Sequence, residues 1–394
     1  MKILLFNTLY YPNLIGGAEK SVQLLAEGLL KEGEEPIVVT TSSRDYIDYV
    51  NGVKVYYVKT NNLYWAYNAG KESKLKKPIW HLIDSYNFLN KKIAYIIEKE
   101  RPDIIHTNNL AGFSVIVWKF AKDKNIKIIH TLRDYYLLCP KSTMFNEKLN
   151  RNCGKQCCGC KLYSFPKKLL SQDIDAVVGV SKFILNKHLE YGYFKNTKIK
   201  KHIYNPVTVS TSVDKNISKN IRLGIIGLLA KSKGIEFVLD KFSKMKLERV
   251  ELHIYGKGKN ENYENYLIEK YSLENIFFEG FKSPKEIFSN IDILIIPSLW
   301  HEPFSRVLIE SYSYGVPVLA SKRGGIPENV IEGKTGFLFD PDKNGDFHKK
   351  FKDMISYYTS NKFDPSYIQK FARDNFSIKN VLNEYIKIYS NLLK

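Results

Sequence analysis

The stretch from Asp292 to Pro317 constrains the fold more than any other part of the sequence. It begins with the compact apolar run Ile293 to Ile296, which Pro297 and Ser298 end. From Pro303 onward, apolar residues recur at spacings of three and four. This order predicts a buried strand, a loop and an amphipathic helix. Ligands of open α/β sheets bind at the carboxyl ends of such strands, so the loop is a candidate binding site.

Two glutamates mark this candidate site. Glu302 is at the tip of the loop, and Glu310 follows eight residues later, about two helical turns along and on nearly the same face. A helix start offers free backbone N–H groups, so Phe304, Ser305 and Arg306 can hold a phosphate while both carboxylates accept hydrogen bonds from hydroxyls. A nucleotide sugar carries both kinds of group. The alternative is an ordinary first-turn acid followed by a solvated helix residue.

The wider sequence favours the first interpretation. The run EPFSRVLIE, followed by SYGVPVLASKRGGIPENVIEGKTGFLF, resembles the signature of retaining glycosyltransferases of family 4, which have the GT-B fold. The E-x7-E pattern, the Gly-x-Pro and the GG-x-PE turn all stand in register. The resemblance implies an α/β protein with two Rossmann-like domains facing each other across a cleft. It also implies that Glu302 holds hydroxyls of the sugar and Glu310 the ribose of the nucleotide.

The spacing of the two glutamates argues against hydrolysis. A retaining glycosidase needs carboxylates about 5 Å apart, whereas residues eight apart on a helix are roughly 12 Å apart. The resemblance to family 4 implies instead that a hexosyl group passes to an acceptor hydroxyl with retained configuration. Cationic and backbone donors would stabilise the departing diphosphate. Because no DxD motif occurs in a suitable position, we expect no catalytic metal.

A second strand and turn in the C-terminal half supply candidate phosphate ligands. The predicted strand Arg222 to Gly227 is followed by LLAKSKGIEF. Members of family 4 commonly have an arginine after the first glycine and a lysine before the second. Here Leu228 replaces the arginine, and Lys233 precedes Gly234. The resemblance thus assigns the donor diphosphate to Lys233 together with the Gly16-Gly17 turn, and Gly227 is a further candidate for donor binding. One donor-phosphate cation of the family pattern is missing.

A glycine-rich turn follows the first predicted strand, Lys2 to Thr8, and leads into a helix from about Ala18 to Lys31. Gly16 and Gly17 have no Cβ, so a ligand can approach their backbone and the start of the helix closely. A double glycine is as often only a turn. In family 4, however, the backbone amides at this position face the donor phosphates and sugar.

The sequence departs from the family pattern after the strand Lys127 to Leu132. Family members usually have a histidine before the aspartate at this strand end, but this chain has Arg133-Asp134. His130 points to the opposite side of the strand and does not inherit the role of that histidine. Arg133 is a candidate catalytic residue because a guanidinium can donate hydrogen bonds to phosphate or sugar oxygens. It cannot act as a base.

All five cysteines lie in one segment, 139–160, namely Cys139, Cys153, Cys157, Cys158 and Cys160. Three of them have the C-x3-C-x2-C spacing of an iron–sulfur site, but no barrel-like repeat surrounds them. Cys139, Cys153, Cys157 and Cys160 are a possible zinc set that would staple an irregular loop. Free thiols or a redox disulfide are the alternatives. We interpret the cluster as structural.

The patterns divide the chain into four parts. Residues 1–206 form a Rossmann-like acceptor domain with the Cys-rich insertion 139–160, and the polar segment 207–220 is a linker. Residues 221–373 form a Rossmann-like donor domain. The C-terminal helix, 374–394, has an apolar face made by Val381, Tyr385, Ile388, Tyr389 and Leu392. The resemblance implies that this face packs back on the first domain, although it could also pack wholly on the second.

The charge of the chain suggests anionic partners. The formal net charge is +19, and residues 1–206 hold 32 Lys or Arg against 18 Asp or Glu. No helix-turn-helix, zinc-finger or RNP motif accompanies this excess, so we expect no nucleic acid partner. Residues 61–80 mix Trp and Tyr with lysines, which suits membrane docking or acceptor binding; a solvated loop is the alternative. Without an apolar run of about 18 residues or a signal peptide, we expect a cytoplasmic protein with peripheral contact to the inner face of an anionic membrane.

Together these observations predict a retaining, metal-independent glycosyltransferase. Its co-substrate would be a nucleotide-diphosphate sugar, with no other cofactor, and its acceptor a glycan or lipid-linked molecule of surface polysaccharide biosynthesis. A non-catalytic GT-B protein that binds a nucleotide sugar or a polyanion is the alternative, supported by Arg133 and Leu228. A GT-B epimerase is a third class that the sequence leaves open.

Overall fold

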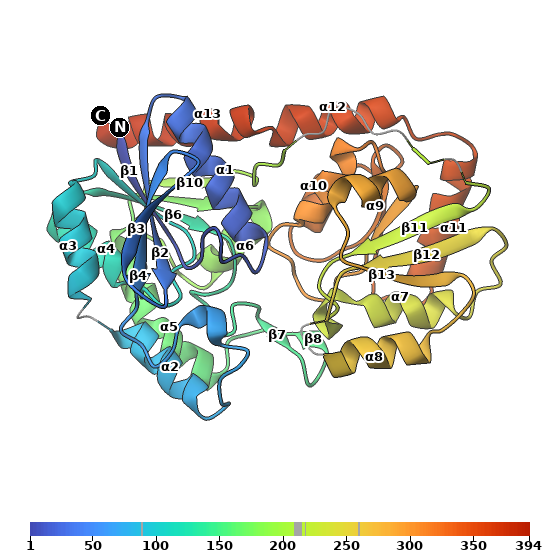
Figure 1. Ribbon diagram of the computed structural model, residues 1–394, viewed down its shortest axis with the longest axis horizontal. Coiled ribbons are helices and arrows are strands. Elements are labelled where there is room, and N and C mark those ends of the chain that lie inside the picture. Colours follow the sequence, from blue (N-terminus) through green and yellow to red (C-terminus); the bar gives the residue numbers. More distant parts are fainter. Residues whose placement is uncertain (88–89, 209–214, 217, 259–260) are drawn as a thin grey trace. The chain divides into compact units, whose positions relative to one another are not determined.

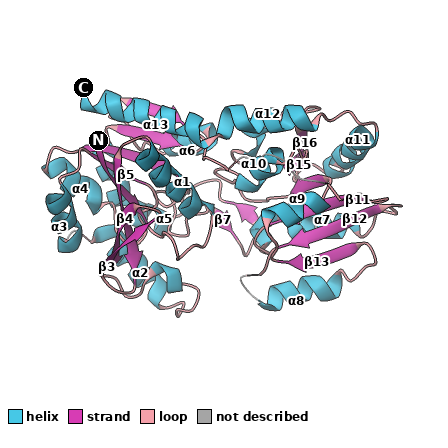
Figure 2. Cartoon of the chain, turned by 45° about the horizontal axis from the view of Figure 1, so that its top comes forward, coloured by secondary structure: helices cyan, strands magenta, loops and turns pink. Residues whose placement is uncertain are grey.

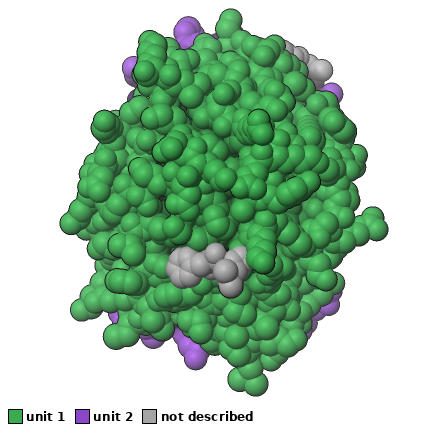
Figure 3. All heavy atoms as spheres, turned by 90° about the vertical axis from the view of Figure 1, so that its left-hand side faces the viewer, with its two compact units in different colours: residues 1–144, 154–206, 378–394 green, residues 145–153, 207–377 purple. Residues whose placement is uncertain are grey.

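The chain folds into two compact units. A computed structural model describes residues 1–87, 90–208, 215–216, 218–258 and 261–394. Unit 1 consists of residues 1–144, 154–206 and 378–394, and unit 2 of residues 145–153 and 207–377 (Figure 3). The chain therefore passes from one unit to the other four times, after residues 144, 153, 206 and 377.

Unit 1 is built on parallel strands joined by helices (Figure 1). Its strands are β1 (Lys2–Asn7), β2 (Glu35–Ser42), β3 (Tyr46–Val50), β4 (Val53–Lys59), β5 (Ile104–Thr107), β6 (Lys127–Leu132), β9 (Ala176–Gly179) and β10 (Ile199–His202). Its helices are α1 (Gly17–Lys31), α2 (Lys76–Tyr86), α3 (Lys91–Glu100), α4 (Ile116–Asp123), α5 (Cys158–Leu170), α6 (Lys182–Glu190) and α13 (Ile378–Leu393).

The strand order of this sheet is β10-β9-β6-β5-β1-β2-β4-β3. Neighbouring strands run parallel except β3, which pairs antiparallel with β4. Both β5 and β9 are buried along their whole length, as expected for parallel strands covered on both faces. The strand order reverses at β1, which lies between β5 and β2, so the loops after β1 and β5 leave the sheet side by side.

The last helix is part of the core of unit 1. The side chains of Val381, Leu382, Tyr385, Ile388, Tyr389 and Leu392 lie in the same buried cluster as residues of β1 and α1. Figures 1 and 2 show α13 beside α1. Gly28 of α1 permits this packing, because a Cβ there would lie 2.4 Å from Leu382 Cδ1. Tyr389 Oη also contacts Nδ1 of the buried His106, 2.7 Å away. The apolar face of α13 is thus buried within unit 1.

Unit 2 has a second parallel sheet and a separate hairpin. Its strands are β7 (Phe145–Asn146), β8 (Arg151–Asn152), β11 (Ile221–Ile226), β12 (Val250–Tyr255), β13 (Ile276–Gly280), β14 (Ile293–Ile296), β15 (Val318–Ser321) and β16 (Gly336–Phe339). Its helices are α7 (Ile235–Phe242), α8 (Glu261–Lys270), α9 (Pro284–Asn290), α10 (Arg306–Ser313), α11 (Asp346–Thr359) and α12 (Pro365–Phe376). Within the described residues the main sheet has the order β13-β12-β11-β14-β15-β16, with all pairs parallel.

Two predicted boundaries differ from the structure. The segment 139–160 is not a single insertion of the first domain, because residues 145–153 form the β7–β8 hairpin of unit 2. The C-terminal helix of unit 1 begins at Ile378, and unit 2 extends to Ser377. Most of the central part of the predicted linker, residues 209–214 and 217, lies outside the described residues. Among the helices that are described, none has the length and apolarity needed to cross a membrane.

Buried histidines should make unit 1 sensitive to acid. His188 is fully buried, and burial lowers its pKa to about 4. In the unfolded chain its pKa returns to about 6.5, so the unfolded state binds the proton more readily. Stability that is complete above pH 6.5 is therefore lost as the pH falls toward 4, by up to about 1.4 kcal/mol per pH unit. His188→Gln should reduce this loss, measured as a smaller decrease of the melting temperature between pH 6.5 and 4.5.

The matched control for this prediction is His348→Gln, which changes an exposed histidine of α11. It should retain the pH dependence of the wild type. Equal slopes for the wild type and His188→Gln would show that protonation of His188 does not oppose folding.

Candidate functional site

The loops after β11 and β14 meet at the point where the strand order of unit 2 changes direction. From β11 the chain continues outward through β12 and β13, whereas β14 leads to β15 and β16 on the other side. Because β11 and β14 are parallel neighbours, their carboxyl ends lie at the same edge of the sheet. This is the position at which open α/β sheets bind ligands.

Glu302 lies in the loop after β14 and is only 5% exposed. Its Oε1 accepts hydrogen bonds from Ser298 Oγ, at the end of β14, and from Lys233 Nζ, 2.7 Å away. Lys233 ends a short 3-10 turn, Lys231–Lys233, that follows β11, and its side chain is 32% exposed. A buried carboxylate requires such partners, because an isolated charge is costly to remove from water. The structure thus brings together a cation and a carboxylate from the two loops.

Glycines allow these loops to approach each other. Gly234 has φ +71°, and a Cβ there would lie 1.9 Å from the carbonyl oxygen of Pro297. Gly324 has φ +59°, and a Cβ there would lie 2.1 Å from the carbonyl oxygen of Glu302. The backbone N–H of Gly325 donates to that same carbonyl at 2.8 Å. Larger residues at the two glycines would displace the backbone that carries Glu302 and Lys233.

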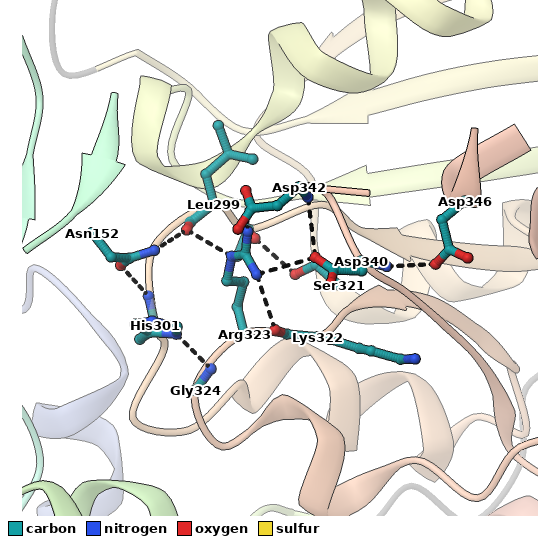
Figure 4. A network of polar contacts seen from close by, with 11 residues as sticks. Asn152, Leu299, His301, Ser321, Lys322, Arg323, Gly324, Asp340, Asp342 and Asp346 are labelled. Carbon is teal, nitrogen blue, oxygen red and sulfur yellow. Dashed lines mark hydrogen bonds and ion pairs between the residues drawn. The ribbon is translucent and has the colours of Figure 1, made fainter. Parts of the chain in front are cut away.

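A network of polar contacts holds the loop just before Glu302 (Figure 4). Asn152 of β8 makes two hydrogen bonds to this loop: Nδ2 donates to the carbonyl of Leu299 at 2.7 Å, and Oδ1 accepts from the N–H of His301 at 2.9 Å. Arg323 Nε also donates to the carbonyl of Leu299, at 3.2 Å. The N–H of Gly324 donates to Nδ1 of His301 at 3.2 Å. The hairpin β7–β8 is therefore part of the support of the site.

Arg323 is held in turn by two carboxylates. Its guanidinium lies 3.5 Å from Asp340 Oδ1 and 2.6 Å from Asp342 Oδ1. These two residues have the spacing of a DxD motif, and in this structure both carboxylates face Arg323 (Figure 4). The pair therefore contributes to the support of the loop through Arg323.

The helix after this loop begins later than its sequence pattern predicted. Its first residue is Arg306, with Ser305 as the N-cap, so Glu302 and Phe304 lie before the helix. The prediction that the two glutamates share one helical face is therefore wrong, and so is the separation calculated from a continuous helix. Glu310 lies on α10 and forms an ion pair with Arg306 at 3.3 Å.

Of the remaining candidates near this edge, Phe304 and Ser305 are close to the start of α10. The ring of Phe304 packs on Phe376 of α12, with centroids 6.2 Å apart. Among the residues that the structure describes, the hydroxyl of Ser305 makes no capping hydrogen bond to α10. Gly227 follows β11 with φ +146°, and the neighbouring Leu228 is 42% exposed. The structure places all of these residues in unit 2.

The other predicted site residues lie in unit 1. Gly16 is the N-cap of α1, and its N–H donates to the carboxylate of Glu19 at 3.0 Å. The amide of Gly16 is therefore already engaged within the helix start, which the sequence pattern did not predict. Burial raises the pKa of Glu19, and the charge of Arg133 opposes this effect. Gly17 is the first residue of α1.

Arg133 follows β6 and is only 8% exposed. Its Nε donates to Asn108 Oδ1 at 2.8 Å, and its Nη1 donates to Asn205 Oδ1. Asn108 directly follows β5, so the guanidinium lies at the edge of the sheet where the strand order reverses. The adjacent Asp134 is partly buried, and burial raises the pKa of its carboxyl group to about 6.

The cysteines are all free thiols in the structure. Cys139 and Cys160 form a hydrogen bond, which lowers the pKa of Cys139 to about 6. The N–H of Cys160 donates to Cys157 Sγ, 3.5 Å away, at the start of α5. Cys153 belongs to unit 2. Within the described ranges, no group of three or more His, Cys, Asp or Glu side chains is placed to hold a metal ion.

Sequence reasoning missed three residues that support the site. Ser298 was interpreted only as the end of a strand, and Asn152 only as part of a cysteine-rich insertion. Arg323 had no assigned role. Their partners are fixed by long-range contacts, since Asn152 and Leu299 are 147 residues apart. A polar residue directly after a buried strand was the one local signal, and it applied to Ser298.

Comparison with known families covers both halves of the chain. Residues 15–210 match the family described as Glycosyltransferase Family 4, and residues 211–365 match Glycosyl transferases group 1. An uncharacterized 42.6 kDa protein in the cps region of Klebsiella pneumoniae is 36% identical over 99% of this chain and 100% of its own length. The uncharacterized glycosyltransferase MJ1607 of Methanocaldococcus jannaschii is 25% identical over 99% of this chain and 98% of its own.

Solved structures with the same fold include a sucrose-phosphate synthase from Thermosynechococcus elongatus. It aligns with a TM-score of 0.78 and 16% identity over 99% of this chain and 98% of its own. The Anabaena protein HepE, solved in complex with UDP and glucose, aligns with a TM-score of 0.71 and 18% identity over 99% of each chain. At these identities the likeness concerns the fold.

Loss of Asn152 should loosen the loop that carries Glu302. Asn152→Ala removes both hydrogen bonds, so we expect a cost of about 1–2 kcal/mol in stability and faster amide exchange at His301. Asn152→Asp retains an acceptor for His301 but places a carboxylate against the carbonyl of Leu299, so it should also weaken the contact. Hydrogen exchange of peptides covering residues 297–304 measures both effects.

Asn146→Asp is the matched control. Asn146 lies in the same hairpin, and its Oδ1 accepts from the N–H groups of Lys148 and Leu149 at 3.1 Å, which an aspartate can also do. Asn146→Asp adds the same negative charge as Asn152→Asp and should leave amide hydrogen exchange at residues 297–304 unchanged. Unchanged exchange in Asn152→Ala would show that the hairpin does not support this loop.

Proposed function

Because the chain belongs to the glycosyltransferases of family 4 and has their GT-B fold, we propose that it is a retaining hexosyltransferase. The donor is a nucleotide-diphosphate sugar, and the acceptor is a hydroxyl of a glycan or a lipid-linked molecule in surface polysaccharide biosynthesis. The cps region of the Klebsiella pneumoniae relative supports this biosynthetic role. The complex of HepE with UDP and glucose supports a nucleotide-sugar donor.

The observation that carries the proposal is the contact between Lys233 and Glu302 at the edge where β11 and β14 end. A nucleotide sugar presents anionic phosphates next to sugar hydroxyls. A cation and a buried carboxylate 2.7 Å apart match these two groups at one place. In the proposal, Lys233 binds the diphosphate and Glu302 accepts hydrogen bonds from the hydroxyls of the sugar.

The start of α10 completes the donor site in this proposal. The first N–H groups of a helix have no partners within it, so the backbone at Phe304, Ser305 and Arg306 is suited to a phosphate. Glu310, on the same helix, accepts from the ribose. Its carboxylate faces Arg306 in the structure, so ribose binding and this ion pair compete for the same oxygen atoms. Gly227 leaves space for the donor beside its turn.

Unit 1 contributes Gly17, Gly16 and Arg133 to the proposal. These residues lie after β1 and β6, at the carboxyl edge of the sheet. Arg133 donates hydrogen bonds to phosphate or sugar oxygens and helps to stabilise the charge that develops on the departing diphosphate. Since these groups and Lys233 would supply that stabilisation, no metal is needed in the proposed reaction. Addition of a chelator should leave the rate unchanged.

The acceptor and the location follow from charge. The excess of Lys and Arg over Asp and Glu among residues 1–206 suits an anionic lipid-linked acceptor at the inner face of the membrane. A non-catalytic protein that binds a nucleotide sugar is the second candidate. Leu228 supports it, because it stands where the family commonly has a phosphate-binding arginine. Turnover of a donor distinguishes the two.

Glu302→Gln should lower the turnover of the donor. The amide keeps the size of the side chain and an acceptor for Ser298, but it removes the charge that pairs with Lys233. We expect kcat/KM to fall by about 10²–10³-fold with little change in melting temperature. The measurement is nucleotide release from UDP-, GDP- and ADP-sugars, combined with thermal stabilisation by each donor.

Glu269→Gln is the control, because Glu269 is an exposed carboxylate of α8 in the same unit. It should behave as the wild type. If a donor stabilises the wild type but is not consumed with a broad set of acceptors, the binding protein replaces the transferase. If Glu302→Gln is fully active, the assigned role of Glu302 is wrong.

Retention can be tested on the product. With an α-linked donor, the new glycosidic bond should also be α, which the anomeric proton coupling in the NMR spectrum of the isolated product reports. A β-linked product would overturn the retaining mechanism while leaving glycosyl transfer itself intact.

A further inference from the structure

Helices α2 and α5 of unit 1 lie side by side (Figures 1 and 2). Tyr163 Oη of α5 donates to the carbonyl of Pro78 in α2 at 3.3 Å, and Tyr86 Oη of α2 donates to the carbonyl of Leu162 in α5 at 2.9 Å. The rings of His81 and Tyr163 are also in contact, with centroids 5.8 Å apart. The two helices therefore form one continuous surface, which we call the α2–α5 surface.

Each helix exposes a row of large apolar side chains on this surface. Leu75, at the N-cap of α2, is followed by Ile79 and Leu82 at spacings of four and three, and α5 has a corresponding row at spacings of three and four. Such spacings place a row on one face of a helix. The six side chains are each between 46% and 84% exposed: Leu75, Ile79, Leu82, Leu162, Phe165 and Leu169.

The buried faces of the same helices are already used for the core. Trp80 and Asp84 of α2 are buried, as are Ser164 and Lys167 of α5. The exposed rows are therefore additional apolar faces and not the faces that attach the helices to unit 1. Six large, exposed apolar side chains gathered on two adjacent helices are typical of an interaction site.

Lysines predominate around the rows. Every exposed charged side chain within α2 and α5 is a lysine, namely Lys76, Lys161 and Lys168. The one carboxylate of the two helices, Asp84, is buried. Further exposed lysines, Lys71 and Lys74, precede α2, and between them the partly buried Glu72 pairs with Lys76 at 3.0 Å. Lysines beside exposed Leu, Ile and Phe are the combination found on helices that lie in the interface of an anionic membrane.

We propose that the α2–α5 surface docks the protein on an anionic lipid bilayer, with the apolar rows entering the interface and the lysines contacting the headgroups. This inference deepens the peripheral membrane contact of the proposed function and rests on that contact, not on sugar transfer. Charge selects the bilayer over a second copy of the chain, because two such surfaces would place lysines against lysines. The exposed row of α5 extends the predicted docking segment, residues 61–80, to a second helix.

The net charge of +19 alone would attract anionic vesicles, so the test must separate the surface from the whole chain. The full chain is sedimented with vesicles of phosphatidylcholine alone or with roughly one third phosphatidylglycerol, at low and raised salt. We expect binding to the anionic vesicles. The double variant Ile79→Ser/Phe165→Ser should bind about tenfold less or weaker still, because it removes apolar area without changing charge.

The control variant is Tyr49→Ser/Tyr95→Ser, which changes two equally exposed apolar side chains of unit 1 outside the α2–α5 surface. It should bind within about twofold of the wild type, as it leaves the docking area intact. Raised salt screens the general attraction and should enlarge the difference between the two variants. Equal loss in both, or no loss in Ile79→Ser/Phe165→Ser, would overturn the inference.

Two further readouts separate membrane docking from self-association and from catalysis. If sedimentation velocity shows a dimer that Ile79→Ser/Phe165→Ser dissociates, and neither protein binds vesicles, the surface is an interface between copies and the membrane inference is wrong. Nucleotide release with a soluble acceptor is measured on the same variants and should match the wild type. Failure of donor turnover in all proteins would refute the transferase and leave the vesicle result standing.

Discussion

The buried carboxylate of Glu302 is the constraint on which the candidate site depends. A charge that is removed from water must be paired or hydrogen-bonded, and here Ser298 and Lys233 provide the partners. Ser298 lies two residues after β14, at the start of the loop, whereas Lys233 belongs to the neighbouring loop. The carboxylate therefore joins the two loops at the edge of the sheet. This pairing requires a close approach of the backbones, which Gly234 and Gly324 permit because they have no Cβ.

The support of this site is not local in sequence. The β7–β8 hairpin belongs to unit 2 although the chain before and after it belongs to unit 1. Asn152 binds a donor and an acceptor of the backbone at Leu299 and His301, as a neighbouring strand would. The hairpin thus holds the loop just before Glu302 through these two hydrogen bonds. It also means that a change in residues 145–153 acts on Glu302 through backbone hydrogen bonds, without touching its carboxylate.

Much of the fold follows from local patterns, because parallel strands that are buried on both faces produce short apolar runs such as Ile293–Ile296. The same patterns placed the start of the following helix too early. A helix beginning at Pro303 would use the carbonyl of Glu302 within the helix, but this carbonyl accepts from the N–H of Gly325 instead. The residues up to Ser305 are consequently not helical. Nothing in the local sequence encodes this contact or the pairing of Asn152, since both depend on segments brought together by the fold.

The pair formed by Lys233 and Glu302 also bears on how a donor would enter. Lys233 is about one-third exposed, so a phosphate can reach it from solvent and replace the carboxylate as its partner. Glu302 is then left with Ser298 and with unused acceptor capacity in a buried position, which is unfavourable until hydroxyls of the sugar occupy it. Binding of the phosphate would therefore favour binding of the sugar. In the proposed function, one ion pair would thus couple the two halves of the donor and favour it over a free nucleotide, which supplies the phosphates without the hydroxyls of the transferred sugar.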